Sequence, residues 1–556
     1  MGSDNTITAE GNPEDMRGSN AADREKPLRI SRRDFVKGAA AGAAFIGGTG
    51  ALAACGTAGG PAAAPGVPDK WDKTADVVIV GAGGTGLVAA VTALEAALKA
   101  DPEAKPSVTV LEKASVVGGT TAVSGGEIQA SSTALQWAAG VEDDTPEAHL
   151  QYWIEAAEGL ADPELVKVMA ENAPDNIQWL VDHGVDYISV YGVSPIPYVD
   201  PAVMVPRIHV PAGKGEATQV GTGAVLVETL AGVAREKGAI FMLETSVTGL
   251  VRDPDRGVIG VRADVGGDEI YVEAKQAVIL ATGGFDHNQE MSRAFSPQQL
   301  WALETGQCWC TPTNTGDGIK LAMELGADLA GLGGTIGVAS TMIGVAPLAV
   351  GLPEVPGVWV NKYGQRFVNE GAHYAYAMRA VFQQEQHVAW AIFDQGVREM
   401  GGAAIGGIWG PWSDDLSEEI ASGKVKTGDT PRALGSAIVA NGEQLEATVV
   451  KWSEDMATGA DTLFRKTYGL VALDRAPYYA TPITEVNLGS CGGLKINTQA
   501  QVVDVNGEVI PRLYAGGMVA GGFIGPYYPG SGTAINSTVT FGRIAGDAAA
   551  GEEPWS

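Results

Sequence analysis

The chain has 556 residues, which is longer than one ordinary compact domain, so two domains are expected. Hydrophobic residues make up 45% of it and charged residues 19%, as in globular proteins, and its 76 glycines suit an α/β protein with many tight turns. The net charge of -29 argues against a nucleic-acid partner, because binding to phosphates requires clustered Lys and Arg.

The chain begins with features of an export signal. Residues 31–37 (SRRDFVK) have a twin-arginine pattern, which an export machinery recognises as an address. The Gly/Ala-rich run 38–54 that follows is too short and too weakly apolar for a membrane span and is typical of a signal peptide. We therefore expect an exported, extracytoplasmic protein.

The end of this run has the pattern of a lipoprotein processing site, Leu-Ala-Ala-Cys at 52–55. It predicts a lipid on Cys55 as the only membrane anchor, whereas ordinary cleavage near Ala54 is the alternative. We assign residues 1–55 to a twin-arginine signal with a lipobox and 56–73 to a Gly/Ala/Pro-rich linker.

The first predicted element of the fold is a dinucleotide-binding unit. Residues 76–80 (DVVIV) are typical of a buried parallel strand, and the turn Gly81-Ala82-Gly83-Gly84-Thr85-Gly86 follows before a small-residue helix over 87–99. In this pattern the glycines permit a tight turn, close approach of a pyrophosphate, and close packing of helix on strand. A second strand over 107–111 ends in Glu112, an acceptor for ribose hydroxyls.

Three further glycine-rich segments favour FAD over NAD. Residues 118–126 (GGTTAVSGG) form a loop just after the ribose-binding strand. Residues 277–285 (AVILATGGF) form a strand that enters another glycine turn, and residues 513–517 (LYAGG) repeat that design. Separate glycine turns can surround an extended dinucleotide along its whole length.

The cysteines restrict other redox chemistry. Cys55, Cys308, Cys310 and Cys491 cannot form a conventional four-thiolate iron–sulfur site if Cys55 serves elsewhere, and the sequence has no C-x-x-C-H haem motif. Cys308 and Cys310 flank Trp309 at a spacing too short for a zinc knuckle, so we interpret them as free thiols in the core. We expect no metal site, and redox chemistry that rests on the flavin alone.

These motifs resemble a family of FAD-dependent oxidoreductases that includes soluble fumarate reductases, the related succinate dehydrogenase flavoproteins, urocanate reductases and 3-ketosteroid dehydrogenases. The resemblance covers Thr74 to Asp547 and includes Val360-Asn361 and Arg366-Phe367-Val368-Asn369-Glu370. It implies an α/β fold, with a discontinuous Rossmann-like FAD-binding domain at 74–300 and 486–550 and an inserted α+β capping domain at 301–485.

The FAD itself is expected to be non-covalent, because members with covalent flavin carry a histidine in the loop that is 118–126 here, and this loop has none. The residues predicted to contact FAD are Gly81, Gly83, Gly84, Gly86, Glu112, Lys113, Gly119, Thr120, Thr121, Ser124, Gly125, Gly126, Val247, Ala281, Thr282, Gly283, Gly516, Gly517, Gly532, Thr533, Ala534 and Ile535.

The C-terminal segment 525–535 (GPYYPGSGTAI) indicates the branch of the family. The fumarate-reductase branch carries an Arg in its corresponding motif, because Arg binds carboxylates through a planar fork. This segment has no Arg, and we expect the nearest, Arg543, to cap its helix or face solvent. The segment instead resembles the Tyr-Pro-Gly-x-Gly motif of 3-ketosteroid dehydrogenases, which implies that the Tyr528 hydroxyl and the Gly532 N–H hold a ketone oxygen.

Residues 476–480 (APYYA) and 488–494 (LGSCGGL) also follow the ketosteroid branch, and we expect Tyr479 to pack rather than catalyse. The resemblance implies a capping-domain Tyr as proton donor or acceptor, for which Tyr374 is the candidate. A structural role for Tyr374 and an acid–base role for His373 are the alternatives.

The resemblance thus implies an FAD-dependent oxidoreductase that moves hydride between the flavin and a C–C bond adjacent to a ketone. Its substrate would be a steroid-like or other apolar enone, turned over in either direction, with a separate protein or a quinone as electron partner. One alternative is an exported reductase of fumarate, urocanate or a similar acid, anchored by Arg366 or Arg379. Another is a surface lipoprotein that binds flavin without catalysis.

Overall fold

The computed structural model describes residues 66–213, 216–220, 222–341, 344–345, 357–400, 413, 415–438, 440–525 and 528–555. These residues belong to one compact unit, Thr57–Ser556. The predicted export signal, the lipobox with Cys55 and the first part of the linker lie outside the described residues. Within the described ranges, the helices fall short of the length and apolarity that crossing a membrane requires.

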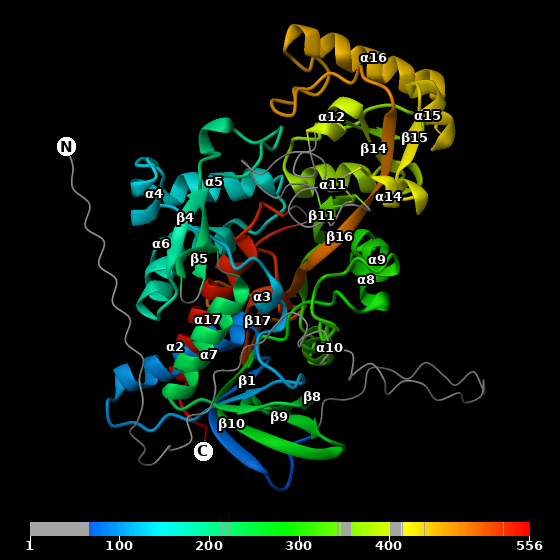
Figure 1. The fold of residues 1–556 in the computed structure, drawn as a ribbon. Helices are drawn as coiled ribbons and strands as arrows, with labels where there is room; N and C mark the ends of the chain where they lie inside the picture. The colour runs from blue at the N-terminus through cyan, green and yellow to red at the C-terminus, as the bar shows by residue number, and fades with distance from the viewer. Residues whose placement is uncertain are drawn as a thin grey trace, which may run out of the picture. The chain divides into compact units, whose positions relative to one another are not determined.

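A mainly parallel sheet carries the first glycine turn, as the sequence predicted (Figure 1). Its strands lie in the order β17, β18, β10, β1, β2 and β7, and the hairpin of β8 and β9 extends it along β10. Strands β18, β10, β1, β2 and β7 run parallel, and β17 pairs antiparallel with β18. The strands are β1 (Lys73–Val80), β2 (Val108–Leu111), β7 (Ile240–Met242), β8 (Thr245–Asp253), β9 (Gly257–Val265), β10 (Asp268–Leu280), β17 (Gln501–Val503) and β18 (Val509–Ala515).

Three helices pack beside this sheet. They are α2 (Gly84–Ala100), α7 (Gly223–Glu236) and α17 (Thr533–Ala550). Helix α2 includes the helix predicted over 87–99, and it packs against both α17 and α7. Gly542 and Gly546 allow the close approach of α17 to α2, since a Cβ on Gly546 would lie 2.6 Å from the Ala89 carbonyl oxygen. The mixture of parallel strands and packed helices confirms the predicted α/β fold class.

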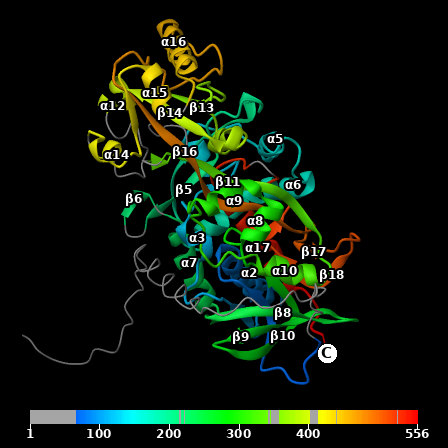
Figure 2. The same ribbon diagram turned by 90° about the vertical axis from the view of Figure 1, so that its right-hand side faces the viewer.

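A second sheet is organised around β16, an 18-residue strand (Figure 2). Its first half pairs with β14 and β15, its middle with β11, and its last residues with β19. The strands of this sheet are β11 (Leu329–Thr341), β12 (Gly344–Val345), β13 (Val358–Asn361), β14 (Ala389–Asp394), β15 (Lys426–Gly428), β16 (Tyr478–Lys495) and β19 (Ala520–Gly521). The predicted boundary at 485/486 falls inside β16, and the division into FAD-binding and capping domains stays a prediction.

Short helices surround this second sheet, and Trp452 of α16 is buried in a hydrophobic cluster with Phe393 of β14. The helical segments are α8 (Gln289–Phe295), α9 (Pro297–Glu304), α10 (Asp317–Glu324), α11 (Tyr374–Phe382), η3 (Glu385–His387), α12 (Gln395–Glu399), α14 (Ser417–Ala421), α15 (Pro431–Ala437), α16 (Gly442–Thr458) and η5 (Gly517–Val519).

A third, smaller sheet follows the loop after β2. It comprises β3 (Ile128–Gln129), β4 (Tyr187–Tyr191), β5 (Ile208–Gly213) and β6 (Glu216–Val220). The helical segments in this region are α3 (Gly119–Val123), α4 (Ala134–Ala138), α5 (Pro146–Ala156), α6 (Pro163–Asp182) and η2 (Pro201–Val203). Helix α6 packs on α17, so this region is tied to the helices of the first sheet.

Candidate active site

The turn between β1 and α2 has the geometry of a dinucleotide cradle. Gly81 has φ +104°, and a Cβ on it would lie 2.4 Å from the Ala281 carbonyl oxygen. A Cβ on Gly86 would lie 1.9 Å from the Gly81 carbonyl oxygen, so the helix reaches the strand only because this residue is glycine. At Gly83, by contrast, the nearest atom to such a Cβ is 3.9 Å away, which leaves the backbone open to a ligand.

The acidic residue at the end of β2 supports this turn directly. Glu112 is 9% exposed and accepts hydrogen bonds from the Ala82 N–H through Oε2 and from the Ala114 N–H through Oε1, both at 2.8 Å. Each carboxylate oxygen keeps a further lone pair for a ribose hydroxyl. Lys113 instead pairs with Asp317 at the start of α10, with Nζ 2.5 Å from Oδ2.

The predicted loop 118–126 lies beside the first turn of α2. The Gly118 N–H donates to the Ala82 carbonyl at 2.8 Å, and the Gly84 N–H donates to Thr121 Oγ1 at 3.2 Å. Ser124 Oγ accepts from the Gly126 N–H at 3.2 Å and thereby closes the loop. Thr120 Oγ1 accepts from the Asn314 side chain at 3.1 Å, and Gly119 and Gly125 lie in the same loop.

The other predicted glycine turns follow strands β10 and β18, which run parallel to β1. They therefore lie at the same edge of the first sheet as the turn after β1. The Ala281 N–H donates to the Val80 carbonyl at 2.8 Å, and the Gly516 N–H donates to the Leu280 carbonyl at 3.2 Å. The predicted contacts Thr282 and Gly283 follow β10, and Gly517 follows β18. Ligands of parallel α/β sheets bind at this edge. Val247 lies instead on β8, paired with Ala263.

The segment around Tyr528 leads into α17. Tyr528 is buried, and its hydroxyl accepts a hydrogen bond from the Ala534 N–H at 3.2 Å. Gly532 precedes Thr533 at the helix start with φ +90°, and a Cβ there would lie 2.5 Å from the Gln129 nitrogen. A side chain is therefore excluded at Gly532 by both conformation and space. Ile535 lies in the same first turn.

The structure brings Tyr374 next to Tyr528, although they lie far apart in the chain. Tyr374 begins α11, and its ring centroid is 6.4 Å from that of Tyr528. His373 caps α11 and stacks on Tyr374 at a centroid distance of 4.3 Å. A Cβ on Gly530 would lie 3.0 Å from His373 Nε2, so the imidazole faces the segment that holds Tyr528.

Burial keeps these three side chains uncharged. It raises the pKa of Tyr374 and of Tyr528 above the ordinary range, so both phenols hold their protons. It lowers the pKa of His373 to about 3, so the imidazole is neutral. His373 Nδ1 accepts from the Ala375 N–H at 3.3 Å, which places the proton of the neutral ring on Nε2, a buried atom with no hydrogen-bond partner among the described residues.

Comparison with known proteins identifies the family. The family described as "FAD binding domain" matches residues 76–535. The chain belongs to this flavoprotein family. A fumarate reductase (cytochrome) from Shewanella frigidimarina is 30% identical over 483 residues, 86% of this chain and 77% of the relative. A digoxin reductase from Eggerthella lenta is 28% identical over 574 residues, 95% of this chain and 98% of the relative.

A solved structure of the family has the same fold. It is 3-ketosteroid-Δ4-(5α)-dehydrogenase from Rhodococcus jostii RHA1 in complex with 4-androstene-3,17-dione, with a TM-score of 0.72 and 28% identity over 87% of this chain and 98% of that chain. The protein is thus an FAD-dependent oxidoreductase that acts on CH–CH groups, and the predicted family and cofactor are confirmed. The open backbone at Gly83 and the acceptor Glu112 fit this cofactor.

Sequence reasoning missed several residues around Tyr528. Gln129 of β3 donates from Nε2 to the Ser531 carbonyl at 3.0 Å, and His149 Nε2 lies 3.3 Å from Gln129 Oε1. Tyr152 of α5 donates its hydroxyl hydrogen to the Pro529 carbonyl. These residues have no motif around them, and only the tertiary contact between this region and the segment before α17 reveals them.

Two arginines that bear on carboxylate binding have partners within the protein: Arg366, one of the two candidate anchors, and Arg543, the arginine nearest to segment 525–535. Arg366 donates to Glu370 and to Asp461 through four contacts of 2.8 to 2.9 Å, in the interior beside α16. Arg543 was predicted to cap its helix or face solvent, and this was wrong. It is partly buried and donates to Asn176 Oδ1 at 2.7 Å, because α6 packs on α17.

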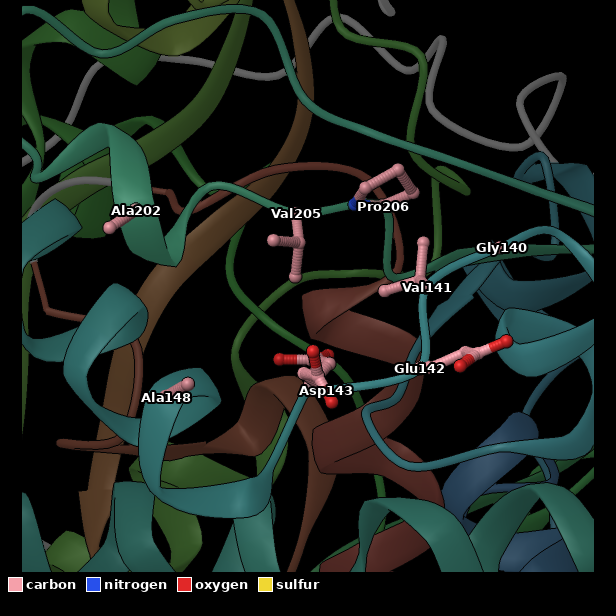
Figure 3. Close-up of a pocket in the computed structure, with 9 residues that line it drawn as sticks. Gly140, Val141, Glu142, Asp143, Ala148, Ala202, Val205 and Pro206 are labelled. Atoms are coloured by element: carbon pink, nitrogen blue, oxygen red, sulfur yellow. The ribbon is translucent and has the colours of Figure 1, made fainter.

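A surface cavity of about 330 Å³ has a different set of lining residues (Figure 3). It is lined by the loop 140–144 together with Ala148, Ala202, Val205 and Pro206. Figure 3 shows Asp143 and Glu142 on one side and Val205 and Pro206 on the other. The remaining acidic residue, Asp144, is already bound by Arg207, whose Nε lies 2.8 Å from Oδ2. The cavity shares no residue with the site described above.

Proposed function

We propose that this enzyme transfers hydride at a carbon–carbon double bond adjacent to a ketone, with an apolar, steroid-like enone as substrate and reduction as the favoured direction. The observation that carries the proposal is the pair of buried phenols, Tyr374 and Tyr528, with ring centroids 6.4 Å apart. Together with His373 they make a neutral surface, which suits a carbonyl better than a carboxylate. FAD, when bound, supplies the hydride.

Tyr528 is the proposed donor to the ketone oxygen. Its oxygen already accepts from the Ala534 N–H, so its own hydrogen is left to donate. The Gly532 N–H is proposed as a second donor to the same oxygen. Two donors on one oxygen stabilise the negative charge that develops there as the β-carbon accepts hydride.

Tyr374 is the proposed source of the proton for the α-carbon. Desolvation raises its pKa, and the neighbouring Tyr528, Tyr191 and Tyr152 raise it further. A dehydrogenase base would need the opposite, a pKa lowered by a neighbouring cation or a similar interaction. A phenol that keeps its proton is available as a donor to a carbanion-like carbon, whereas the base of a dehydrogenase has to be deprotonated first, so the resting protonation state of Tyr374 fits reduction.

The relatives support the same class of substrate. The digoxin reductase matches this chain over nearly its whole length, and the 3-ketosteroid dehydrogenase shares the fold over 98% of its own chain. The first is named for digoxin and the second for ketosteroids, with 4-androstene-3,17-dione bound in its structure, and segment 525–535 lacks the Arg that a dicarboxylate would need.

A second candidate, reduction of a small unsaturated acid, is favoured by the 30% identity to a fumarate reductase. It needs a cationic anchor, and Arg366 is already engaged by Glu370 and Asp461. Arg379 of α11 is the other anchor considered for this reaction. If the acid is the substrate, Arg379→Ala should raise the KM for fumarate or urocanate at least about tenfold. If an enone is the substrate, the KM for the enone should stay unchanged.

We also propose export by the twin-arginine route, lipid anchoring through Cys55, and electron exchange with a separate protein or a quinone. Residues 31–37 and 52–55 support the first two proposals. Membrane fractionation tests them: Cys55→Ala should release an exported, soluble protein, whereas Arg32→Lys combined with Arg33→Lys should keep it in the cytoplasm. Retention of the Cys55→Ala protein on the membrane would contradict the lipid anchor.

The function is tested by reducing the purified enzyme with light under anaerobic conditions and mixing it with single acceptors. A steroid enone should reoxidise the flavin at least about a hundredfold faster than fumarate, urocanate or a cinnamate, because only the enone offers a ketone to Tyr528. Faster reoxidation by fumarate than by every enone would contradict the proposal.

A further inference from the structure

Two thiols lie close together on the segment that precedes α10. Cys308 and Cys310 flank Trp309, and the three described cysteines of the chain are free thiols. Cys308 is half-buried beside Trp309, which is 46% exposed, whereas Cys310 is buried. One thiol of the pair is therefore within reach of a small reagent, and the other is shielded behind it.

The sulfur of Cys308 is surrounded by hydrogen-bond donors. His287 Nε2 lies 3.4 Å from Sγ, and the Asn487 side-chain amide donates to Sγ at 3.7 Å. The Cys310 thiol lies beside the same sulfur and donates to the Asn487 carbonyl oxygen at 4.0 Å, and the protonated Cys308 thiol donates to the Asp286 carbonyl oxygen at 3.8 Å. The donors His287 and Asn487 stabilise the thiolate, which is the reactive form of cysteine.

The titratable groups that face Cys308 are Cys310, His287 and Asp286. The Cys310 hydrogen bond, followed by His287, lowers the pKa of Cys308 to about 5 against the cost of burial. The contact with Cys308 raises the pKa of His287, and burial raises the pKa of Cys310 and of Asp286. These shifts favour a Cys308 thiolate beside a protonated Cys310, and the contact with Cys308 favours the positively charged form of His287.

We propose that Cys308 and Cys310 are an oxidation site for hydroperoxides, at which Cys308 is the attacking thiol and Cys310 the resolving thiol. The Cys308 thiolate attacks one peroxide oxygen, the O–O bond breaks, and an alcohol or water leaves with a proton from His287, which gives a sulfenic acid. The Cys310 sulfur then attacks Cys308, its proton leaves with the hydroxyl as water, and a disulfide forms. The two thiols lose two electrons, which the peroxide gains.

This site is connected to the loop that faces FAD. Thr311, the residue after Cys310, donates its N–H to Thr120 Oγ1 at 3.1 Å. The Asn314 side-chain amide donates to Asp286 at 2.9 Å and also to Thr120 Oγ1. Formation of the disulfide should therefore shift the visible spectrum of the bound flavin. The inference does not depend on the proposed substrate.

The first test is the pH profile of alkylation of the intact holoenzyme by iodoacetamide, with labelling at Cys308 measured by peptide mass spectrometry. The rate should reach half its maximum near pH 5, because the thiolate reacts. The half-maximal pH, rather than the rate at pH 7, distinguishes Cys308 from an ordinary thiol. A thiolate of lower pKa is also a weaker nucleophile, so at pH 7 it is alkylated only slightly faster than an ordinary cysteine. Buried Cys491 in the same sample is the internal control and should stay unlabelled.

Substitutions locate the cause of the reactivity. His287→Gln should move the half-maximal pH upward by at least about 1 unit, because it removes a positive charge beside the thiolate. With one equivalent of hydrogen peroxide, the wild type should lose two hydrogens across Cys308 and Cys310. Cys310→Ser should instead leave a sulfenic acid on Cys308 that a dimedone probe traps.

A half-maximal alkylation pH of about 9 in the wild type would overturn the inference, since that is the ordinary range of a thiol. So would peroxide treatment that leaves both thiols reduced, or that yields only sulfinic acid on Cys308. Each of these readouts uses the wild-type fold, so a variant that fails to fold does not obscure the result.

Discussion

At the scale of single residues, burial decides which chemistry the candidate site can perform. Tyr374 and Tyr528 are held close together and protonated, and His373 beside them is held neutral. Desolvation is the largest cause in all three cases, because each side chain is enclosed by the protein. The same residues in water would present a histidine that titrates near neutral pH.

This protonation pattern predicts the pH dependence of the reaction. The rate of flavin reoxidation by a saturating enone should be constant between about pH 5 and pH 9. His373 loses its proton near pH 3, below this range, and the phenols lose theirs above it, so no site residue changes charge within it. Stopped-flow absorbance measures the rate, and a bell-shaped profile with a pKa of 6 to 7 would contradict the account.

At the scale of elements, glycine turns and buried ion pairs hold neighbouring segments of the chain in place. The turn between β1 and α2 is defined by contacts at Gly81 and Gly86, where side chains have no room. In the second sheet region, Arg366 is held between Glu370 and Asp461, which joins the segment after β13 to the one after α16.

Gly86→Ala should therefore abolish retention of FAD. The added methyl would lie 1.9 Å from the Gly81 carbonyl oxygen, so α2 has to move away from β1. Gly232→Ala in α7 is the matched control, since a Cβ there meets nothing within 4 Å. Alanine in a helix is favoured over glycine by about 1 kcal/mol, so the control should bind FAD fully and melt at the same or a higher temperature. Equal flavin content in the two variants would contradict the prediction.

Arg366→Ala should lower the free energy of unfolding by about 3 to 5 kcal/mol, because it removes the guanidinium that lies between two buried carboxylates. Arg432→Ala, in which the exposed pairs with Glu443 and Glu446 are lost, should leave the free energy of unfolding nearly unchanged, because solvent screens those pairs. Denaturant unfolding of the two variants measures the difference. Similar stabilities would mean that the Arg366 network contributes little.

The strands, turns and helix around FAD could be predicted from the sequence because their signals are local. Residues 76–80 and Gly81 to Gly86 carry the β-branched run and the glycines that the backbone itself requires. The neighbours of Tyr528 could not be predicted, since Gln129 and Tyr152 reach it only through tertiary contacts. Arg543 was misjudged for the same reason, because its partner Asn176 belongs to a distant helix.

At the scale of the whole molecule, the proposed substrate site is assembled from three distant parts of the chain. The segment before α17 provides Tyr528, α11 provides Tyr374, and β3 provides Gln129. Strand β16 runs through the second sheet, since it pairs with β14 at its start and with β19, near Tyr528 in sequence, at its end. Such an arrangement can enclose a substrate and exclude water during hydride transfer.

The central claim is that Tyr528 holds a ketone oxygen, and Tyr528→Phe tests it most directly, with Tyr479→Phe as the matched control. Tyr479 is also buried but donates to Gln395 in the second sheet region. With photoreduced enzyme and a steroid enone, Tyr528→Phe should slow flavin reoxidation by about 10² to 10³-fold at unchanged flavin content, and Tyr479→Phe by less than about twofold. Equal rates in Tyr528→Phe and wild type would contradict the claim.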